Sequence, residues 1–320
     1  LALIAGCANS SQPITTASLQ EAEQKLVDLC KKESNLDVVL FREPNRLWIY
    51  VPTESNFFKL EVSKDKPGEP QPPSEARTIY FLDTKFADNG FTIRYDIGKG
   101  KKSADSPGYG MKYSDEFQKI QRQVLTAVSQ AFADVERREE EPGTFMKIKG
   151  DRDFINQEKN ASHKRLVQAY IKTERVPDFF VIVLADIKNG LEAKMYFYLE
   201  DLNRGMVDYL FMEEYSRRVM NEGATGAIEA VGDKTGRHLK THDLTWTEFL
   251  TKQISHRLKF KYAQSDFPPG DDTETEILKV VAKTINGYGF DAFETVKLVD
   301  IGQKKEYLFH KGQLAAYGKE

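Results

Sequence analysis

The chain has 320 residues, of which 40% are hydrophobic and 30% charged, so it is long enough to form one large domain or two ordinary ones around a sizeable core. Its 46 basic and 49 acidic side chains give a net charge of -3, which argues against a nucleic-acid-binding protein, because such proteins need a concentrated basic surface. Its 21 glycines and 12 prolines are too few for a collagen-like or low-complexity chain.

The chain begins with an apolar segment that ends in small residues and a cysteine. Ile4-Ala5-Gly6-Cys7 resembles the lipobox of bacterial lipoproteins, in which the cysteine is lipidated and becomes the new N-terminus. The resemblance implies that residues 1–6 are the remnant of a signal peptide and that Cys7 carries the lipid. The alternative is a buried strand in which Cys7 is only a small apolar residue.

A lipid on Cys7 would hold the protein almost permanently at a membrane, because several acyl chains each contribute about 0.8 kcal/mol per buried CH₂. Ala8 follows the cysteine where retained lipoproteins carry Asp, so the resemblance implies an outer-membrane protein that faces the periplasm. The expected partners are the membrane itself and an envelope protein or glycan. Cys30 then has no second cysteine for a disulfide, and we expect it to be a small core residue on a helix.

The first half of the chain predicts helices alternating with strand pairs. Ser18-Leu19-Gln20-Glu21 is a capping box, and Ser114 is a predicted N-cap for a helix whose apolar stripe reaches Val135. A charged run at 136–143 is expected to end that helix in solvent. The predicted elements are a tether at 8–17, a helix at 18–32, strands at 36–41, 46–51 and 57–62, a loop at 64–74, a hairpin at 77–97, a helix from 114 and an irregular connection at 144–176.

The second half opens on the strongest strand signal. Residues 178–185 are almost continuously apolar, which predicts a central strand covered on both faces, and Asn189-Gly190 predicts a tight turn into a strand at 192–199. Thr245-Trp246-Thr247-Glu248 is a further capping box. The other predicted elements are a helix at 202–220, a weaker hairpin around 227–236, a helix from 245, a helix capped by the residues 273–276, and strands at 293–299 and 306–309.

These elements predict an α+β fold with antiparallel hairpins packed against amphipathic helices in two lobes. A helix followed by two strands occurs at 18–51, 114–199 and 273–309, and this order of elements is similar to BON-type modules of bacterial envelope proteins. The expected division is 1–17 for signal remnant, lipidation site and tether, 18–142 for an N-terminal domain, 143–176 for a connection and 177–320 for a C-terminal domain.

Three histidines are the candidates for a metal site. His238 and His242 lie four residues apart, and with His256 they would suffice for an open zinc site. Lys240 stands between the first two, where a cation disfavours a metal ion nearby. Surface or capping histidines are therefore the favoured interpretation, and no metal or cofactor is predicted. Gly98-Lys99-Gly100-Lys101 lacks the spacing of a phosphate-binding loop.

The remaining candidates are one carboxylate and two aromatic pairs. Asp186 ends the predicted central strand, where a catalytic acid could lie, but a turn-forming Asp is the commoner role. Trp48 and Tyr50 share one strand face, as do Tyr196 and Tyr198. If exposed, these pairs could bind a glycan or a protein edge; if buried, they are core, which is the favoured interpretation.

The sequence therefore predicts a membrane-anchored envelope protein with a non-catalytic scaffold, adaptor or binding role. The alternative is an envelope hydrolase whose carboxylates converge only in the fold. An enzyme predicts a cleft with pKa-shifted acids, whereas an adaptor predicts a shallow apolar surface or an available sheet edge.

Overall fold

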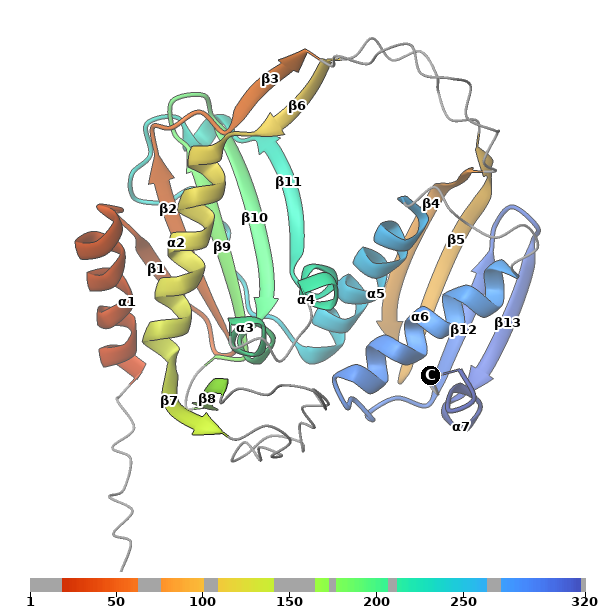
Figure 1. Cartoon of the computed structure of the whole chain (residues 1–320). Coiled ribbons are helices and arrows are strands. Elements are labelled where there is room, and N and C mark those ends of the chain that lie inside the picture. The colour runs from red at the N-terminus through yellow and green to blue at the C-terminus, as the bar shows by residue number, and fades with distance from the viewer. Residues whose placement is uncertain are drawn as a thin grey trace, which may run out of the picture.

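The fold is α+β, as the sequence predicts, with helices packed against two mixed sheets (Figure 1). The structure, a computed structural model, describes residues 19–62, 76–100, 109–140, 165–172, 177–206, 212–263 and 272–317. The predicted lipidation site Cys7, the tether and the N-cap Ser18 lie outside the described residues. Within them, no helix is both long and apolar enough to cross a membrane.

The larger sheet has five strands in the order β1-β2-β9-β10-β11, and only the neighbours β2 and β9 run parallel. Every residue of β9, the central strand, is buried, which confirms the prediction for this segment. The predicted turn at Asn189-Gly190 joins β9 to β10, and Gly190 adopts the positive φ of 63° that such a turn needs. The strands are β1 (Val39–Arg42), β2 (Arg46–Thr53), β9 (Phe179–Asp186), β10 (Leu191–Tyr198) and β11 (Met220–Gly226).

The smaller sheet has four strands in the order β13-β12-β5-β4, and β5 and β12 run parallel. They are β4 (Ala76–Ala87), β5 (Gly90–Gly100), β12 (Thr295–Asp300) and β13 (Lys305–His310). Two further pairs stand apart: β3 (Phe58–Val62) with β6 (Tyr109–Tyr113), and β7 (Ala133–Glu140) with β8 (Arg165–Lys172).

The five-stranded sheet and the four-stranded sheet each contain strands that precede residues 143–176 and strands that follow them. The division into sheets therefore does not follow the domain boundary expected from the sequence. The reason is that one parallel pair in each sheet, β2 with β9 and β5 with β12, joins segments far apart in the chain. Such a pairing has no signature in the periodicity of either strand alone.

One face of the five-stranded sheet is covered by α1 and α2 (Figure 1). The predicted N-cap of α2 is confirmed, because the Ser114 hydroxyl accepts a hydrogen bond from the backbone N–H of Phe117 at 3.1 Å. Cys30 of α1 is a buried core residue, as predicted, and burial raises the pKa of its thiol to about 11. The helices are α1 (Leu19–Ser34), α2 (Asp115–Phe132), α3 (Leu199–Met206), α4 (Met212–Arg218), α5 (Trp246–Ala263), α6 (Thr273–Gly287) and α7 (Lys311–Leu314).

The other face of the same sheet is covered by residues 231–245, which we call the strap, together with the start of α5. The strap follows the short 3-10 helix η1 (Ile228–Ala230) and contains no strand. The prediction of a hairpin around 227–236 is therefore wrong. Gly232 and Gly236 both adopt positive φ values, which takes the chain away from an extended ladder. The strap is held by hydrogen bonds to the sheet, such as that from the Trp48 indole N–H to the His242 carbonyl at 3.2 Å.

Helix α5 packs against the cores of both sheets. Phe249 lies in the core between the five-stranded sheet and the strap, whereas Leu250, Ile254 and Leu258 lie in the core of the four-stranded sheet. The predicted capping box of α5 is confirmed, because Thr245 and Glu248 exchange backbone and side-chain hydrogen bonds. The two lobes are therefore joined by a shared helix.

Three other element predictions need correction. Helix α2 ends at Phe132, and β7 follows where the sequence predicts the solvated end of the helix. The segment 144–176 was expected to be irregular, but it contains β8. The N-cap of α6 is Asp272, whose side chain accepts from the Glu274 N–H, rather than a residue of 273–276. Several short polar residues adjoin the start of α6, so the sequence alone does not select its N-cap.

Candidate functional site

The three candidate metal ligands do not converge. His238 and His242 lie on the strap, and His256 lies on α5, where burial lowers its pKa and its Nε2 has no hydrogen-bond partner among the described residues. Within the described part of the chain, no group of three or more His, Cys, Asp or Glu side chains is placed to hold a metal ion.

His238 instead lies between two carboxylates, an arrangement we call the carboxylate clamp (Glu192, Asp233 and His238). Its Nδ1 is 2.6 Å from Oδ2 of Asp233, and its Nε2 is 2.5 Å from Oε1 of Glu192. Glu192 is buried on β10, whereas Asp233 and His238 belong to the strap, so the clamp fastens the strap to the sheet. The Tyr50 hydroxyl adds a hydrogen bond to the Asp233 carbonyl at 2.7 Å.

The clamp favours the imidazolium form of His238. Burial alone would lower the pKa of His238, but the hydrogen bonds to Asp233 and Glu192 outweigh burial and raise that pKa. Burial likewise opposes ionisation of Asp233, and the hydrogen bonds from His238 and Thr235 hold the pKa of Asp233 well below its usual range. Both ring nitrogens then act as donors, which leaves no lone pair for general-base chemistry. The arrangement is suited to holding the strap.

A buried arginine lies under the other end of the strap and was not singled out by the sequence. Arg46 has no exposed surface, and its Nε and Nη2 have no hydrogen-bond partner among the described residues. Its Nη1 is 3.3 Å from the Nε2 of His242, and its guanidinium lies over the Trp48 ring at 5.3 Å. Burial lowers the pKa of Arg46, while Asp243, among other groups, opposes that shift. An arginine at the first position of a strand carries no sequence signal for burial.

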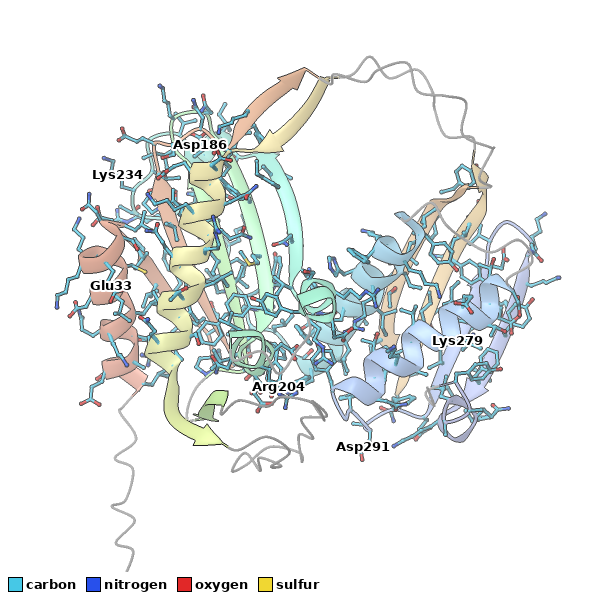
Figure 2. The ribbon with its side chains drawn as sticks, in the orientation of Figure 1. Glu33, Asp186, Arg204, Lys234, Lys279 and Asp291 are labelled. Carbon is cyan, nitrogen blue, oxygen red and sulfur yellow. The ribbon has the colours of Figure 1, made fainter. Side chains whose placement is uncertain are left out.

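The other sequence candidates occupy structural positions. Asp186 is fully buried at the end of the five-stranded sheet (Figure 2), where its Oδ1 accepts from the backbone N–H groups of Lys188 and Asn189 and shapes the turn. All four aromatic candidates are buried, with exposed fractions of 8% or less, so they form core contacts and offer no ligand surface: they are Trp48, Tyr50, Tyr196 and Tyr198.

An accessible hollow lies between α2 and the β11 side of the five-stranded sheet. We call it the α2–β11 groove; its volume is about 340 Å³. Its floor is apolar and includes Phe117, Ile182 and Met195. Its rim is polar, with Gln118, Gln121 and Arg122 on α2 and with Asn221 and Glu222 on β11. An apolar floor with a few polar groups at the mouth is the usual composition of a binding site.

The strand that borders this groove is the last strand of its sheet. β11 pairs with β10 on one side, and most of its residues are exposed. The pairing is irregular between Glu192 and Lys194, opposite Gly223 and Ala224, and the Ala224 N–H donates to the Tyr113 hydroxyl at 3.3 Å. The sequence predicted a helix up to Met220 and did not anticipate this strand, because Asn, Glu and two glycines are poor strand formers.

Comparisons of the chain with protein-family models, with curated proteins and with solved structures found no match.

Proposed function

We propose that this protein is a lipid-anchored envelope component that binds another envelope molecule without catalysing a reaction, and that the α2–β11 groove is its binding site. The observation that carries the proposal is the position of the groove, which has an apolar floor and lies beside a sheet edge that no described strand covers. A binding protein needs such a surface, and an available edge is a common docking element.

The membrane anchor rests on the resemblance of Ile4-Ala5-Gly6-Cys7 to a lipobox. The sequence predicts a tether at 8–17, so a folded part held by that tether would reach its partner from the membrane surface. In this arrangement the lipid determines location and the groove determines specificity.

The carboxylate clamp favours a structural role over the hydrolase alternative. The carboxylate clamp contains pKa-shifted groups, as an active site would, but the side chain of His238 is only 13% exposed and that of Glu192 only 4%. Both imidazole nitrogens are engaged by carboxylates. A substrate would have to displace the strap to reach them.

The anchor is tested by the substitution Cys7→Ser. Metabolic labelling with a fatty acid followed by membrane fractionation should show a labelled, membrane-bound parent and an unlabelled variant that is soluble or unprocessed. Equal labelling and membrane recovery of the two proteins would contradict the lipoprotein proposal.

The groove is tested by cross-linking and affinity purification of the full-length protein from envelope membranes. Gln118 is exposed at the mouth of the groove, so Gln118→Trp should block the groove without disturbing the fold, and should lower recovery of a specific partner by about tenfold or more. Lys119→Trp is the matched control, because it places the same bulk one residue along α2, outside the groove. Equal recovery with both variants would contradict the proposal.

A further inference from the structure

The outer edge of β11 pairs with no described strand, and only the Ala224 N–H among its described backbone groups is shown with a side-chain acceptor, the Tyr113 hydroxyl. β11 bonds to β10 on one side, and no other described strand pairs with it. Backbone N–H and C=O groups at such an edge can pair with an incoming extended chain. The five-stranded sheet ends on its other side in β1, which has only four residues, and a short edge offers few bonds.

The sequence of β11 permits close approach of a second backbone. Its central residue Gly223 has space around it: a Cβ placed there would meet nothing nearer than the Tyr113 hydroxyl at 4.0 Å. A Cβ on Gly226 would meet nothing within 4 Å. Glycine within a strand often marks a place where another backbone comes close. β11 has neither lysine nor proline; of the features that protect sheet edges from pairing, it carries one charge, Glu222, and the irregular pairing at Gly223 and Ala224.

The groove adjoins this edge on the α2 side of the sheet. In a strand added to β11, alternate side chains would point to that side, so one apolar side chain would lie over the groove. Arg122 lies on the rim, and its Nε donates only to the Gln118 carbonyl of its own helix, at 3.3 Å. Among the described residues Arg122 has no acidic partner, so it is available to a carboxylate of the incoming chain.

The surroundings of β11 favour an extended chain over a folded partner. The Nζ of Lys252 on α5 is 3.6 Å from the Oε1 of Glu222 on β11. Figure 1 shows α5 and the four-stranded sheet on the side of the free edge of β11. A second folded copy approaching this edge would meet that lobe. A single strand needs only about 4.8 Å beside β11.

We propose that an extended segment of another protein adds to β11 as a new edge strand, with an apolar side chain in the α2–β11 groove and a carboxylate two residues away on Arg122. This inference rests on the proposed function and names the class of partner. The proposal holds whether the added strand runs antiparallel or parallel to β11.

A displayed library of random dodecapeptides, selected against the full chain, tests the proposal. We expect enriched peptides in which an apolar residue and Asp or Glu are separated by one position. Their affinity should fall about tenfold or more for Arg122→Glu, and should be unchanged for Lys119→Glu, the same charge change outside the groove. No enrichment, or enriched peptides equally weakened by both variants, would overturn the inference.

Two measurements on the best peptide separate strand addition from binding by side chains alone. Two analogues, one N-methylated at the odd-numbered residues and one at the even-numbered residues, should differ in affinity. The reason is that only one of these two sets of N–H groups can face β11. Amide hydrogen exchange should slow in residues 221–226 when the peptide binds. Equal affinity of the two methylated sets, or unchanged exchange in β11, would overturn strand addition. If strand addition is overturned but Gln118→Trp still lowers partner recovery from envelope membranes, the proposed binding function of the groove stands.

Discussion

The two sheets of this molecule differ in how their faces are covered. The five-stranded sheet is covered on both faces, by α1 and α2 on one side and by the strap on the other, and its central strand β9 is buried at every position. The four-stranded sheet packs α5 and α6 on one face, and its strand β12 alternates between buried and partly exposed residues. The comparison shows why β9 is continuously apolar, whereas β12 has the period-two pattern of a half-covered strand.

The cover on the second face of the larger sheet is unusual because the strap has no regular structure. A helix would satisfy its own backbone groups, but the strap takes polar partners from side chains below it: Trp48 and Tyr50 of β2, and Asn45 of the β1–β2 turn. The polar atoms of Trp48 and Tyr50 are therefore buried with partners on the strap. The substitutions at Val181, Phe249 and His238 test this difference between the two sheets.

The largest expected effect is a charge placed in the doubly covered sheet. Val181→Asp should destabilise the protein by about 4 kcal/mol or more, because Val181 is fully buried and an aspartate there has no partner. The matched change on the half-covered sheet is Val299→Asp, at a partly exposed position, which should cost about 1 kcal/mol or less. Chemical denaturation of both variants measures the difference. Equal destabilisation would show that the two sheets are covered alike.

The next effect concerns the helix shared by both lobes. Phe249→Ala should cost about 4 kcal/mol, because the ring is fully buried under the strap and stacks on Phe179 at a centroid distance of 4.6 Å. Since α5 also packs on the four-stranded sheet, amides of β9 and β5 should lose protection from hydrogen exchange together. Lys259→Ala, on an exposed position of α5, serves as the control. Continued protection of β5 alone would indicate lobes that unfold independently.

A smaller and pH-dependent effect is expected at the carboxylate clamp. His238→Gln should cost about 2 kcal/mol near pH 6, because two carboxylates lose a cationic partner. The folded pKa of His238 is raised, so its contribution is complete below about pH 6.5 and is lost as the pH rises through the higher folded value. The pKa of Asp233 is lowered, so its contribution is complete above about pH 3.9 and is lost as the pH falls through the lower folded value.

Thermal melts across pH 4 to 9 measure this dependence. The stability difference between the parent and His238→Gln should be largest between about pH 4 and pH 6.5 and should shrink at alkaline pH. In a Glu192→Gln background the same substitution should cost less, because the two side chains interact directly. A difference that is constant with pH would contradict the imidazolium clamp.

The smallest effect is expected for Asp186→Asn. An asparagine Oδ1 can still accept from the N–H groups of Lys188 and Asn189, whereas the bond that Asp186 Oδ2 accepts from the Asn189 side-chain amide is lost, so the loss of stability should be about 1 kcal/mol. The envelope phenotype of a correctly folded and localised variant should remain intact. A lost phenotype would favour the hydrolase alternative and would contradict the binding role.

Much of the local structure could be predicted from the sequence because local interactions decide it. Ser114 caps α2, Thr245 caps α5, and Asn189-Gly190 forms the β9–β10 turn, each through contacts within a few residues. The parallel pairs β2–β9 and β5–β12 could not be predicted, because they depend on partners over a hundred residues apart. The boundary expected at 143–176 failed to describe the sheets for this reason.

The candidate site was harder to predict than the fold. His238 was singled out for its spacing from His242, yet its partners Glu192 and Asp233 are set by the path of the strap. The groove depends on Gln118 and Arg122, which are ordinary polar residues of an amphipathic helix, and on a strand poor in strand-forming residues. Only the tertiary arrangement makes these residues neighbours.

Site-specific photo-cross-linking in intact cells tests the central claim most directly, that the α2–β11 groove of the membrane-anchored protein holds a specific partner. A photoreactive amino acid at position 118 should give one dominant adduct. The same residue at position 119 should not, and Cys7→Ser should remove the adduct formed from position 118. Identical adducts from both positions, or none from position 118 in a folded and lipidated protein, would contradict the account.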